Sequence, residues 1–302
     1  MKVSDNILLI INPISGDSDK EQVIKQVQMR VREQSGNLEI YRTTGDNDQE
    51  KITKVLNQFE AHRVLVAGGD GTIKLTAEVL RNHSVPIGIL PSGSANGLAY
   101  NLKIPEAPGE ALDIALSDHF WEIDALCINN DLCLHVSDLG LNAELIRNYE
   151  EGKVRGKLGY VLQSVPTLVK SDMPFSFEVS AEGQSLNRQG ILLAIANARQ
   201  YGTGATINPE GQLDDGKFEI LIFKKLDFVE IFKTLGEDIE LDSDFVESIS
   251  TTHAEVHCHQ PVPFQIDGEY YGEVDHIDVS ILPKDIKVAV GDRKNRVKDA
   301  LN

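Results

Sequence analysis

The stretch 63–72 reads RVLVAGGDGT: an apolar run, a glycine turn and the start of a helix-like pattern. A continuous apolar run of this kind is typical of a strand that is buried on both faces of a parallel sheet. Glycines allow a backbone to approach a ligand closely, and the first amides of a helix attract negative charge. The stretch therefore predicts a strand, a turn and a helix that together can hold phosphate.

Strand and helix patterns alternate on both sides of this stretch. Apolar runs predict strands, and apolar residues spaced by three and four predict helices. The predicted strands are 7–11, 38–41, 63–67 and 85–90, and the predicted helices are 20–34, 47–60 and 72–82. This alternation indicates an α/β domain with a doubly wound parallel sheet, which binds ligands at the carboxyl ends of its strands. Three polar loops, 12–16, 68–72 and 92–97, follow strands there.

The second half of the chain has a different pattern. Short strand-like pieces are separated by turn pairs such as Asp215-Gly216 and Asp267-Gly268, and one helical interval spans 157–170. The predicted strands are 125–128, 131–136, 175–180, 190–196, 217–223, 253–259, 262–266 and 274–282. They indicate an antiparallel β-rich, sandwich-like domain. We predict domains at 1–124 and 125–290, with a C-terminal tail over 291–302 that can return to the first domain.

Composition excludes several functional classes. A chain of 302 residues is long enough for two domains with their own cores. Its formal charge of −18 argues against nucleic acid and against general attraction to anionic membranes. No apolar run reaches the length of a transmembrane segment, and the N-terminus lacks the apolar core of a secretion signal. Three cysteines form no disulfide framework, so we expect a cytoplasmic protein.

Each of the three loops has an ordinary alternative to phosphate binding. The loop 12–16 is rich in residues that are common in any turn after a strand, and that explanation is favoured when the loop is taken alone. The carboxylate of Asp70 would repel phosphate. A bridging Mg²⁺, or a role for Asp70 in proton transfer to a substrate hydroxyl, would account for an aspartate at this position. The alternative is a turn aspartate that caps the helix. Ser94 and Asn96 are equally good capping residues.

Taken in order, the three loops resemble the diacylglycerol kinase catalytic domain superfamily, which includes sphingosine, ceramide and bacterial lipid kinases. The pattern is NPxSG at 12–16, GGDGT at 68–72 and PxGSxN at 91–96. In the second half, 196–204 and 213–216 are similar to the segments around the second acidic motif of the family. Asp267-Gly268-Glu269 is similar to its catalytic turn. The resemblance runs from about residue 7 to about residue 282. NAD kinases and phosphofructokinases share GGDG, so the other elements carry the resemblance.

The resemblance implies site residues. Those implied to bind ATP are Asn12, Pro13, Ile14, Ser15, Gly16, Thr43, Gly68, Gly69, Asp70, Gly71, Thr72, Ile73, Lys74, Ser94 and Asn96. Glu269 takes the position of the general base, and Asp70 that of a residue that positions Mg²⁺ and the hydroxyl. Asp124 matches the magnesium network, and Asp215 a structural metal site with the main-chain carbonyls of Gln212 and Lys217. Without the family pattern, both Asp-Gly pairs are best explained as hairpin turns.

The resemblance also implies the function. We expect an ATP- and Mg²⁺-dependent lipid kinase that phosphorylates a hydroxyl of diacylglycerol or of a sphingoid base. Its lipid substrate would lie at a membrane surface, so the expected place is the cytoplasm, peripheral to the inner face of the membrane. Exposed strand edges could pair two copies into a homodimer. The alternatives are a soluble-substrate kinase of the NAD kinase type and a catalytically weak regulator that binds lipid or nucleotide.

Three features depart from the family or compete with it. Lys74-Leu75 replaces the usual Asn-Glu pair after GGDGT, so Lys74 either faces phosphate or is a solvated helix residue. Asn96-Gly97 is more similar to sphingosine kinases than to bacterial diacylglycerol kinases. A basic cluster precedes an apolar stretch and is either a membrane-contacting edge or a charged loop before a core helix. That cluster consists of Arg147, Lys153, Arg155 and Lys157.

Several histidines lie close together near the C-terminus. His253, His257 and His259 flank Cys258, which could indicate a metal site. In a strand these histidines would share one face with Glu255, whereas Ala254, Val256 and Cys258 would face the other way. Strand alternation is therefore the favoured interpretation of the pattern.

Overall fold

The computed structural model describes residues 5–16, 19–81, 83–94, 96–144, 146, 174–201, 205–225, 227, 230, 233, 234, 236 and 240–292. The chain forms two compact units. Unit 1 comprises Met1–Ile123 and Lys284–Asn302, and unit 2 comprises Asp124–Pro283. Two strands pass from one unit into the other: β5 (Phe120–Ile128) and β14 (Glu269–Ala289). Each unit is described by itself below.

Unit 1 is built on a parallel sheet. Its strands are β1 (Asn6–Ile11), β2 (Asn37–Arg42), β3 (Arg63–Gly68), β4 (Ile87–Pro91) and the end of β14. Their order is β14-β4-β3-β1-β2, and every pairing is parallel. All six residues of β3 are buried, as expected for a central strand that has cover on both faces.

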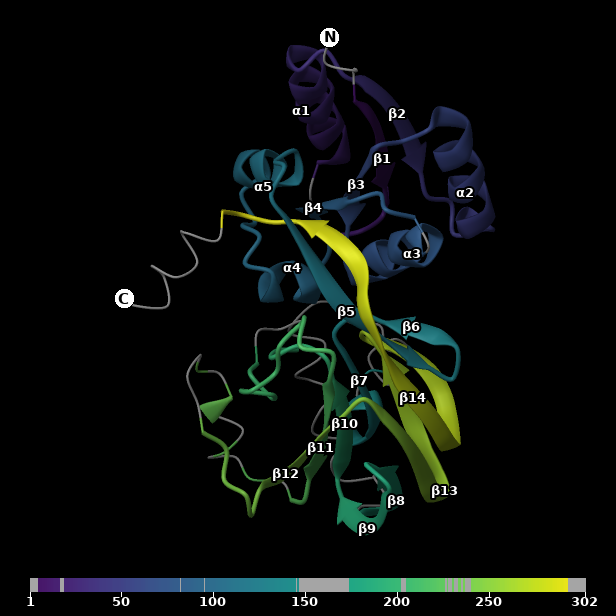
Figure 1. Cartoon of the computed structure of the whole chain (residues 1–302), viewed down its shortest axis with the longest axis vertical. Helices are drawn as coiled ribbons and strands as arrows, with labels where there is room; N and C mark the ends of the chain where they lie inside the picture. Colours follow the sequence, from purple (N-terminus) through teal and green to yellow (C-terminus); the bar gives the residue numbers. More distant parts are fainter. Residues whose placement is uncertain are drawn as a thin grey trace. The chain divides into compact units, whose positions relative to one another are not determined.

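Helices cover this sheet on both sides. They are α1 (Lys20–Glu33), α2 (Asp48–Phe59), α3 (Asp70–Leu80), α4 (Gly97–Asn101) and α5 (Pro108–Ala115). Helix α1 contacts α5, and α2 contacts α3, on opposite sides of the strands (Figure 1). In α1 the buried face contains Val23, Val27 and Val31, the residues whose spacing predicted the helix. The predicted doubly wound α/β fold of this half is confirmed.

Unit 2 is antiparallel. Besides parts of β5 and β14 it contains β6 (Asp131–Cys133), β7 (Val136–Gly140), β8 (Phe175–Ala181), β9 (Gln184–Gly190), β10 (Leu192–Ala196), β11 (Phe218–Phe223), β12 (Val246–Thr251) and β13 (His253–Ile266). The main order is β12-β11-β10-β7-β13-β14, and β8 joins β13 to β9. A large buried cluster that includes Phe177, Phe218 and Phe264 forms the core. The predicted β-rich, sandwich-like fold is confirmed.

Several predicted boundaries in this half differ from the structure. The sequence did not predict β9 and β12, because both are largely polar and lack the apolar run that was used to find strands. Residues 253–266 form one strand rather than two. The last part of β14 belongs to unit 1, where Val288 pairs with Ile87, although the sequence assigned it to the β-rich domain.

Three expectations fall wholly or mostly on parts of the chain that are not described. The predicted helix at 157–170 and the basic cluster from Arg147 to Lys157 lie outside the described residues, as does most of the tail 291–302. Among the described ranges, none of the helices combines the length and the apolar character that crossing a bilayer requires.

Candidate active site

The three predicted loops of unit 1 lie side by side at the carboxyl edge of the sheet. Parallel pairing puts the ends of β1, β3 and β4 next to one another. Backbone hydrogen bonds continue past the strands: the Asn12 amide donates to the Ala67 carbonyl at 3.0 Å and the Ser92 amide to the Gly68 carbonyl at 2.9 Å. The Thr43 amide donates to the Ile11 carbonyl at 2.9 Å, so Thr43 follows β2 at the same edge.

Glycines let these loops touch backbone to backbone. A Cβ atom on Gly93 would lie 2.4 Å from the Cα of Gly69, which is closer than real carbon contacts allow. Gly16 has a φ of +51°, and a Cβ there would lie 2.6 Å from the Ser92 carbonyl oxygen. The glycines of the motifs are therefore needed for packing of loop on loop, before any ligand is considered.

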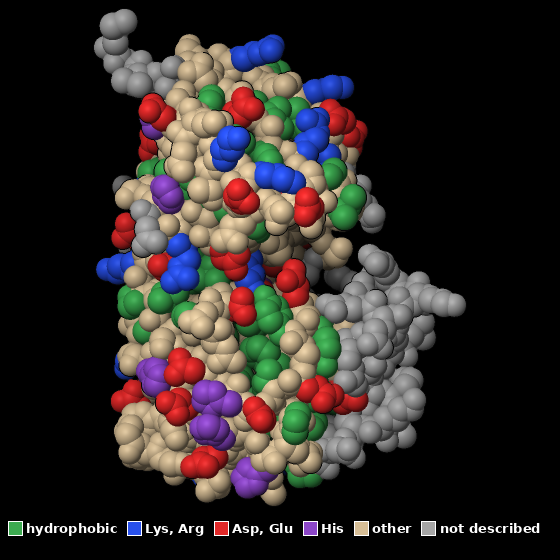
Figure 2. Space-filling view, turned by 90° about the vertical axis from the view of Figure 1, so that its right-hand side faces the viewer, with side chains coloured by type: hydrophobic (Ala, Val, Ile, Leu, Met, Phe, Trp, Pro, Cys, Tyr) green, Lys and Arg blue, Asp and Glu red, His purple; other side chains and the backbone are tan. Residues whose placement is uncertain are grey.

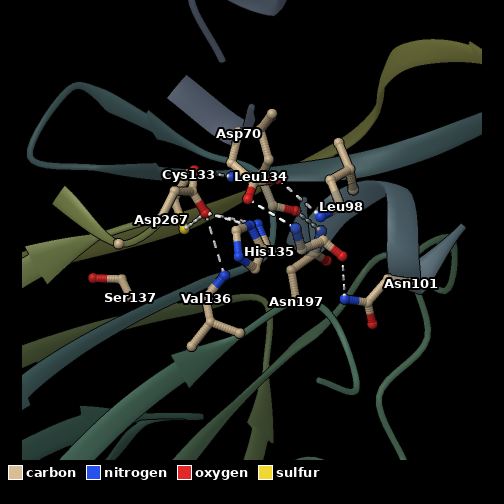
Figure 3. Close-up of polar contacts among 12 residues, drawn as sticks. Asp70, Leu98, Asn101, Cys133, Leu134, His135, Val136, Ser137, Asn197 and Asp267 are labelled. Carbon is tan, nitrogen blue, oxygen red and sulfur yellow. Dashed lines mark hydrogen bonds and ion pairs between the residues drawn. The ribbon is translucent and has the colours of Figure 1, made fainter. Parts of the chain in front are cut away.

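Asp70 joins the second loop to the third. Its Oδ2 accepts a hydrogen bond from the Gly97 amide at 2.8 Å, and its Oδ1 accepts one from the Leu98 amide at 3.0 Å (Figure 3). It therefore caps α4 and not its own helix α3, so the expectation that it caps the helix after its own turn is wrong. Each carboxylate oxygen keeps a further lone pair, so capping leaves room for a cation.

Side chains of the first loop organise the loop itself. Asn12 Oδ1 accepts from the Ile14 amide at 3.1 Å, and Asn12 Nδ2 donates to Thr72 Oγ1 at 3.3 Å. Ser15 Oγ donates to the Asn12 carbonyl at 3.1 Å. Ile14 is 90% exposed, an unusual position for a large apolar side chain. The predicted residues of this loop are brought together with the GGDGT turn.

The third loop and Lys74 differ in how they meet solvent. Asn96 has a φ of +56°, and its side chain bonds back to the Gly93 amide at 2.8 Å and the Gly93 carbonyl at 3.1 Å. Ser94 is exposed. Lys74 is only 5% exposed, so the alternative of a solvated helix residue is wrong. A buried ammonium group needs partners, and Lys74 has them.

One positively charged side chain at this edge was not predicted from the sequence. Lys20, the first residue of α1, donates from Nζ to the Ser92 carbonyl at 3.0 Å. Burial lowers the pKa of Lys20 from its ordinary value. Nothing in the local sequence distinguishes Lys20 from other lysines at the start of a helix. Its position near the third loop follows only from the packing of α1 on the sheet.

In unit 2, Asp124 lies against the turn that carries the second acidic motif. Asp124 is fully buried, its Oδ2 accepts from the Gly216 amide at 2.7 Å, and its amide donates to the Leu213 carbonyl at 2.6 Å. Asp215 Oδ1 accepts from the Lys217 amide at 3.0 Å. The structure thus brings Asp124 together with the segment 212–217. Carboxylates and backbone carbonyls are oxygen donors, the ligand type that Mg²⁺ prefers, so this donor set fits that ion.

Glu269 stands at the end of a tight hairpin. Strands β13 and β14 are joined by Asp267 and Gly268, whose φ values of +51° and +89° are those of a two-residue turn of this kind. Ile266 pairs with Glu269, so the glutamate is the first residue of β14, and it is exposed. The hairpin interpretation of Asp267-Gly268 is therefore confirmed, and Glu269 has a fixed backbone.

Asp267 locks this hairpin to the segment before β7. Its Oδ2 accepts from the Leu134 amide at 2.8 Å, and its Oδ1 accepts from the His135 amide at 3.0 Å and pairs with His135 Nδ1 at 2.9 Å (Figure 3). Burial opposes ionisation of Asp267, but the charge and hydrogen bond of His135 and the backbone amides outweigh it. Together they lower the pKa of Asp267 to about 2. The turn that precedes Glu269 is therefore stabilised by an ionised, buried carboxylate.

A second buried network supports the same turn. Gln265 Oε1 accepts from the Gly268 amide at 2.7 Å, and Gln265 Nε2 donates to Asp138 Oδ2 at 2.6 Å. Tyr201 and Asn142 also donate to that oxygen. Burial raises the pKa of Asp138 to about 6, although these donors oppose the rise. Sequence reasoning missed Asp138 and Gln265, because strand residues of this kind carry no local signal.

Family models match both halves of the chain. Residues 6–128 match the diacylglycerol kinase catalytic domain, and residues 136–290 match the YegS C-terminal NAD kinase beta sandwich-like domain. Among solved structures, that of a diacylglycerol kinase from Bacillus anthracis aligns with a TM-score of 0.73 at 17% identity, over 96% of this chain and 98% of that one. Another structure from the same strain has a TM-score of 0.78 at 20% identity, over 96% and 98%. These likenesses support the fold.

Curated relatives span nearly the same length. A probable lipid kinase YegS-like protein of Xanthomonas euvesicatoria is 29% identical over 274 residues, 85% of this chain and 88% of its own. One from Chromohalobacter salexigens is 27% identical over 265 residues, 85% of each chain. The probable lipid kinase YegS of Salmonella typhimurium is 26% identical over 281 residues, 90% of this chain and 92% of its own. With both of its domains matched, the chain belongs to the family of YegS-like kinases that join a diacylglycerol kinase catalytic domain to a YegS C-terminal domain.

Proposed function

We propose that the protein is a lipid kinase that transfers the γ-phosphoryl group of ATP to a hydroxyl of a membrane lipid. The family supports kinase chemistry, and the names of the relatives support a lipid acceptor. The observation that carries the proposal furthest is the packing of three glycine loops at one sheet edge, with Asp70 capping α4 from the middle loop. This arrangement suits a nucleotide phosphate chain.

In unit 1 the proposed role is to bind and orient ATP. No side chain caps the first turn of α3, and the first amides of a helix can bind phosphate oxygens. Lys20 supplies a positive charge beside the third loop. Exposed Ile14 offers an apolar contact to the nucleotide. Thr43 and Ser94 offer hydroxyl groups at the same edge.

In unit 2 the proposed role is to activate the lipid hydroxyl. Glu269 takes the hydroxyl proton while the hydroxyl oxygen forms a bond to the γ-phosphorus and the bond from that phosphorus to the ADP oxygen breaks. Asp267 and Gln265 hold the hairpin, so Glu269 starts from a rigid backbone. Mg²⁺ would neutralise phosphate charge, and by resemblance to the family Asp70 would hold it in unit 1, while Asp124 of unit 2 matches the magnesium network. Asp215, with the carbonyls of Gln212 and Lys217, would hold a separate structural metal ion.

The proposed acceptors are diacylglycerol and sphingoid bases. Asn96-Gly97 in the third loop favours a sphingoid base, by resemblance to sphingosine kinases. Access to either lipid requires peripheral contact with a membrane surface. The net charge of −18 predicts that such contact is local rather than a general attraction to anionic lipid.

The substrate test is an ATP-consumption assay with lipids in mixed micelles. The panel contains diacylglycerol, monoacylglycerol, sphingosine, ceramide and undecaprenol, with NAD as the soluble acceptor. We expect phosphorylation of one lipid class and none of NAD. Phosphorylation of NAD alone would instead support a kinase of the NAD kinase type. Nucleotide binding without turnover on every acceptor would support a regulator.

The mechanistic test compares two glutamates of the same strand. Glu269→Gln should reduce the turnover rate by about 10²–10⁴-fold, the usual contribution of a general base, with nucleotide binding unchanged. Glu273→Gln, at an exposed position four residues along β14, is the matched control and should keep activity. Full activity of the Glu269→Gln variant would exclude this glutamate as the base.

A further inference from the structure

Unit 2 carries a group of histidines that the proposed phosphoryl transfer does not use. Along β13 the odd-numbered residues from 253 to 259 are exposed and the even-numbered ones are buried, so the predicted strand alternation is confirmed. The exposed face contains His253, His257 and His259, and the neighbouring strand β14 adds His276. The whole chain has eight histidines. Half of them therefore lie on this one hairpin, where Figure 2 shows histidine side chains gathered with carboxylates.

Strand pairing places two of these imidazoles together. His257 of β13 is directly opposite His276 of β14, and their ring centroids are 4.4 Å apart. Glu255, two residues before His257 on the same face, brings a carboxylate oxygen to 3.9 Å from His257 Nε2. One ligand atom from each of Glu255, His257 and His276 lies within 4.8 Å of the other two. The hairpin backbone thus gathers three metal-binding groups from two strands.

We propose that Glu255, His257 and His276 bind one divalent transition-metal ion of the Zn²⁺ class. Two imidazole nitrogens and one carboxylate oxygen form a donor set that suits Zn²⁺, and water completes a four-coordinate ion at an exposed site. Zn–N and Zn–O bonds of about 2.0–2.2 Å require the three ligand atoms to draw closer, which rotations of exposed side chains allow. His257 and Glu255 have side-chain exposures of 52% and 48%, so they have room to rotate.

The neighbouring residues favour this trio over the other possible set. His253, Glu255 and Asp278 also have ligand atoms within 4.8 Å of one another. That set has one imidazole and two carboxylates, and His253 Nε2 already pairs with Asp278 Oδ2 at 3.1 Å. Imidazole-rich sites favour Zn²⁺, whereas oxygen-rich sites favour Mg²⁺ and Ca²⁺. The ion is therefore assigned to the cross-strand histidine pair.

Metal binding at this site would affect the stability of the β13–β14 hairpin. A metal bound by residues of β13 and β14 crosslinks the two strands whose turn carries Asp267 and Glu269. Because the ion binds the folded hairpin and not the unfolded chain in this geometry, it should raise the melting temperature as its concentration rises. This inference is independent of the proposed kinase activity, which uses other residues.

The test measures Zn²⁺ binding to the tag-free full-length protein by isothermal titration calorimetry, with thermal melting as a second readout. The wild type should bind one Zn²⁺ at the cluster and melt at a higher temperature with ZnCl₂ present. His257→Gln and His276→Gln should each weaken binding by at least roughly tenfold, since outer-shell changes alone cost that much. His259→Gln is the matched control: it lies on the same exposed face of β13 but outside the cluster, and should bind as the wild type does.

Three results would overturn the assignment. Equal Zn²⁺ affinity in the wild type and both cluster variants would place any bound metal elsewhere, for example on the thiols of Cys127 or Cys258. An equal loss in His259→Gln would mean that the histidine face binds metal without a defined site. MgCl₂ in place of ZnCl₂ should shift the melting temperature of the wild type and of His276→Gln by the same amount. A larger shift in the wild type would contradict the assignment to an imidazole-preferring ion.

Discussion

The buried carboxylate of Asp267 offers the sharpest test of how the hairpin between β13 and β14 is stabilised. The folded protein lowers the pKa of this group from 3.8 to about 2. A pKa difference of that size corresponds to roughly 2–3 kcal/mol of folding free energy. Because the pKa is lowered, this contribution is complete at neutral pH, begins to fall below about pH 4 and is lost as the pH falls through about 2.

Asp267→Asn removes that contribution at every pH. It also replaces one acceptor oxygen by an amide that faces backbone N–H groups, which adds about 1–3 kcal/mol for buried donors without a partner. The free energy of unfolding should therefore fall by about 3–5 kcal/mol at pH 7. Because the wild type loses its own advantage in acid, the gap between the two proteins should narrow by roughly 2 kcal/mol between pH 7 and pH 2, where the Asp267 carboxyl is half protonated.

The assay is urea unfolding followed by circular dichroism at a series of pH values. Asp275→Asn, at an exposed position on β14, is the matched control and should change the free energy of unfolding by less than about 0.5 kcal/mol throughout. A gap between wild type and Asp267→Asn that stays constant over the whole pH series would refute the reasoning. It would mean that the charge on Asp267 contributes nothing to folding and that only the shape of the side chain matters.

Three further variants test the loops and the second network. Gly93→Ala puts a methyl group against the Gly69 backbone, so it should lower the free energy of unfolding by about 1–3 kcal/mol and weaken ATP binding in calorimetry. Gly109→Ala is the control, because a Cβ there meets nothing within 4 Å, and it should have neither effect. Asp70→Asn should lower the melting temperature and abolish lipid phosphorylation, because an amide cannot accept from both α4 amides; a fully active variant would contradict this. The raised pKa of Asp138, about 6 against 3.8, predicts that the free energy of unfolding of the wild type falls by roughly 3 kcal/mol as the pH rises from about 3 to about 7. Asp138→Asn should flatten this dependence in urea unfolding.

The fold was largely predictable because its signals are local. Most strands and helices of the parallel half carry an apolar period or follow a glycine turn, as β3 and α1 do, although α5 was not predicted. In the β-rich half the prediction failed where a strand is polar on one side and exposed, as in β12. The crossing of β14 into unit 1 was also missed, because its partner Ile87 is 201 residues earlier in the chain and no turn signal separates the two parts of the strand.

The site was predictable only for residues that lie within motifs. The glycine loops and the Asp267-Gly268 turn combine fixed spacing with a backbone requirement, so their positions follow from the sequence. Lys20, Gln265 and Asp138 are single residues on regular elements, and their roles depend on long-range packing. His276 is a similar case: only the register of β13 on β14 places it opposite His257.

The structure changes how the Lys74-Leu75 departure bears on function. On sequence alone, loss of the usual Asn-Glu pair favours a weak enzyme or a regulator. The loop packing that the motif requires is nevertheless complete: Gly69 meets Gly93, and Asp70 caps α4. Lys74 is buried and partnered, so the exchange alters an interior position of α3 and not an exposed ligand contact. The Lys74-Leu75 exchange leaves the packing of the glycine loops intact, so it is weak support for a loss of catalysis. The kinase remains the better proposal.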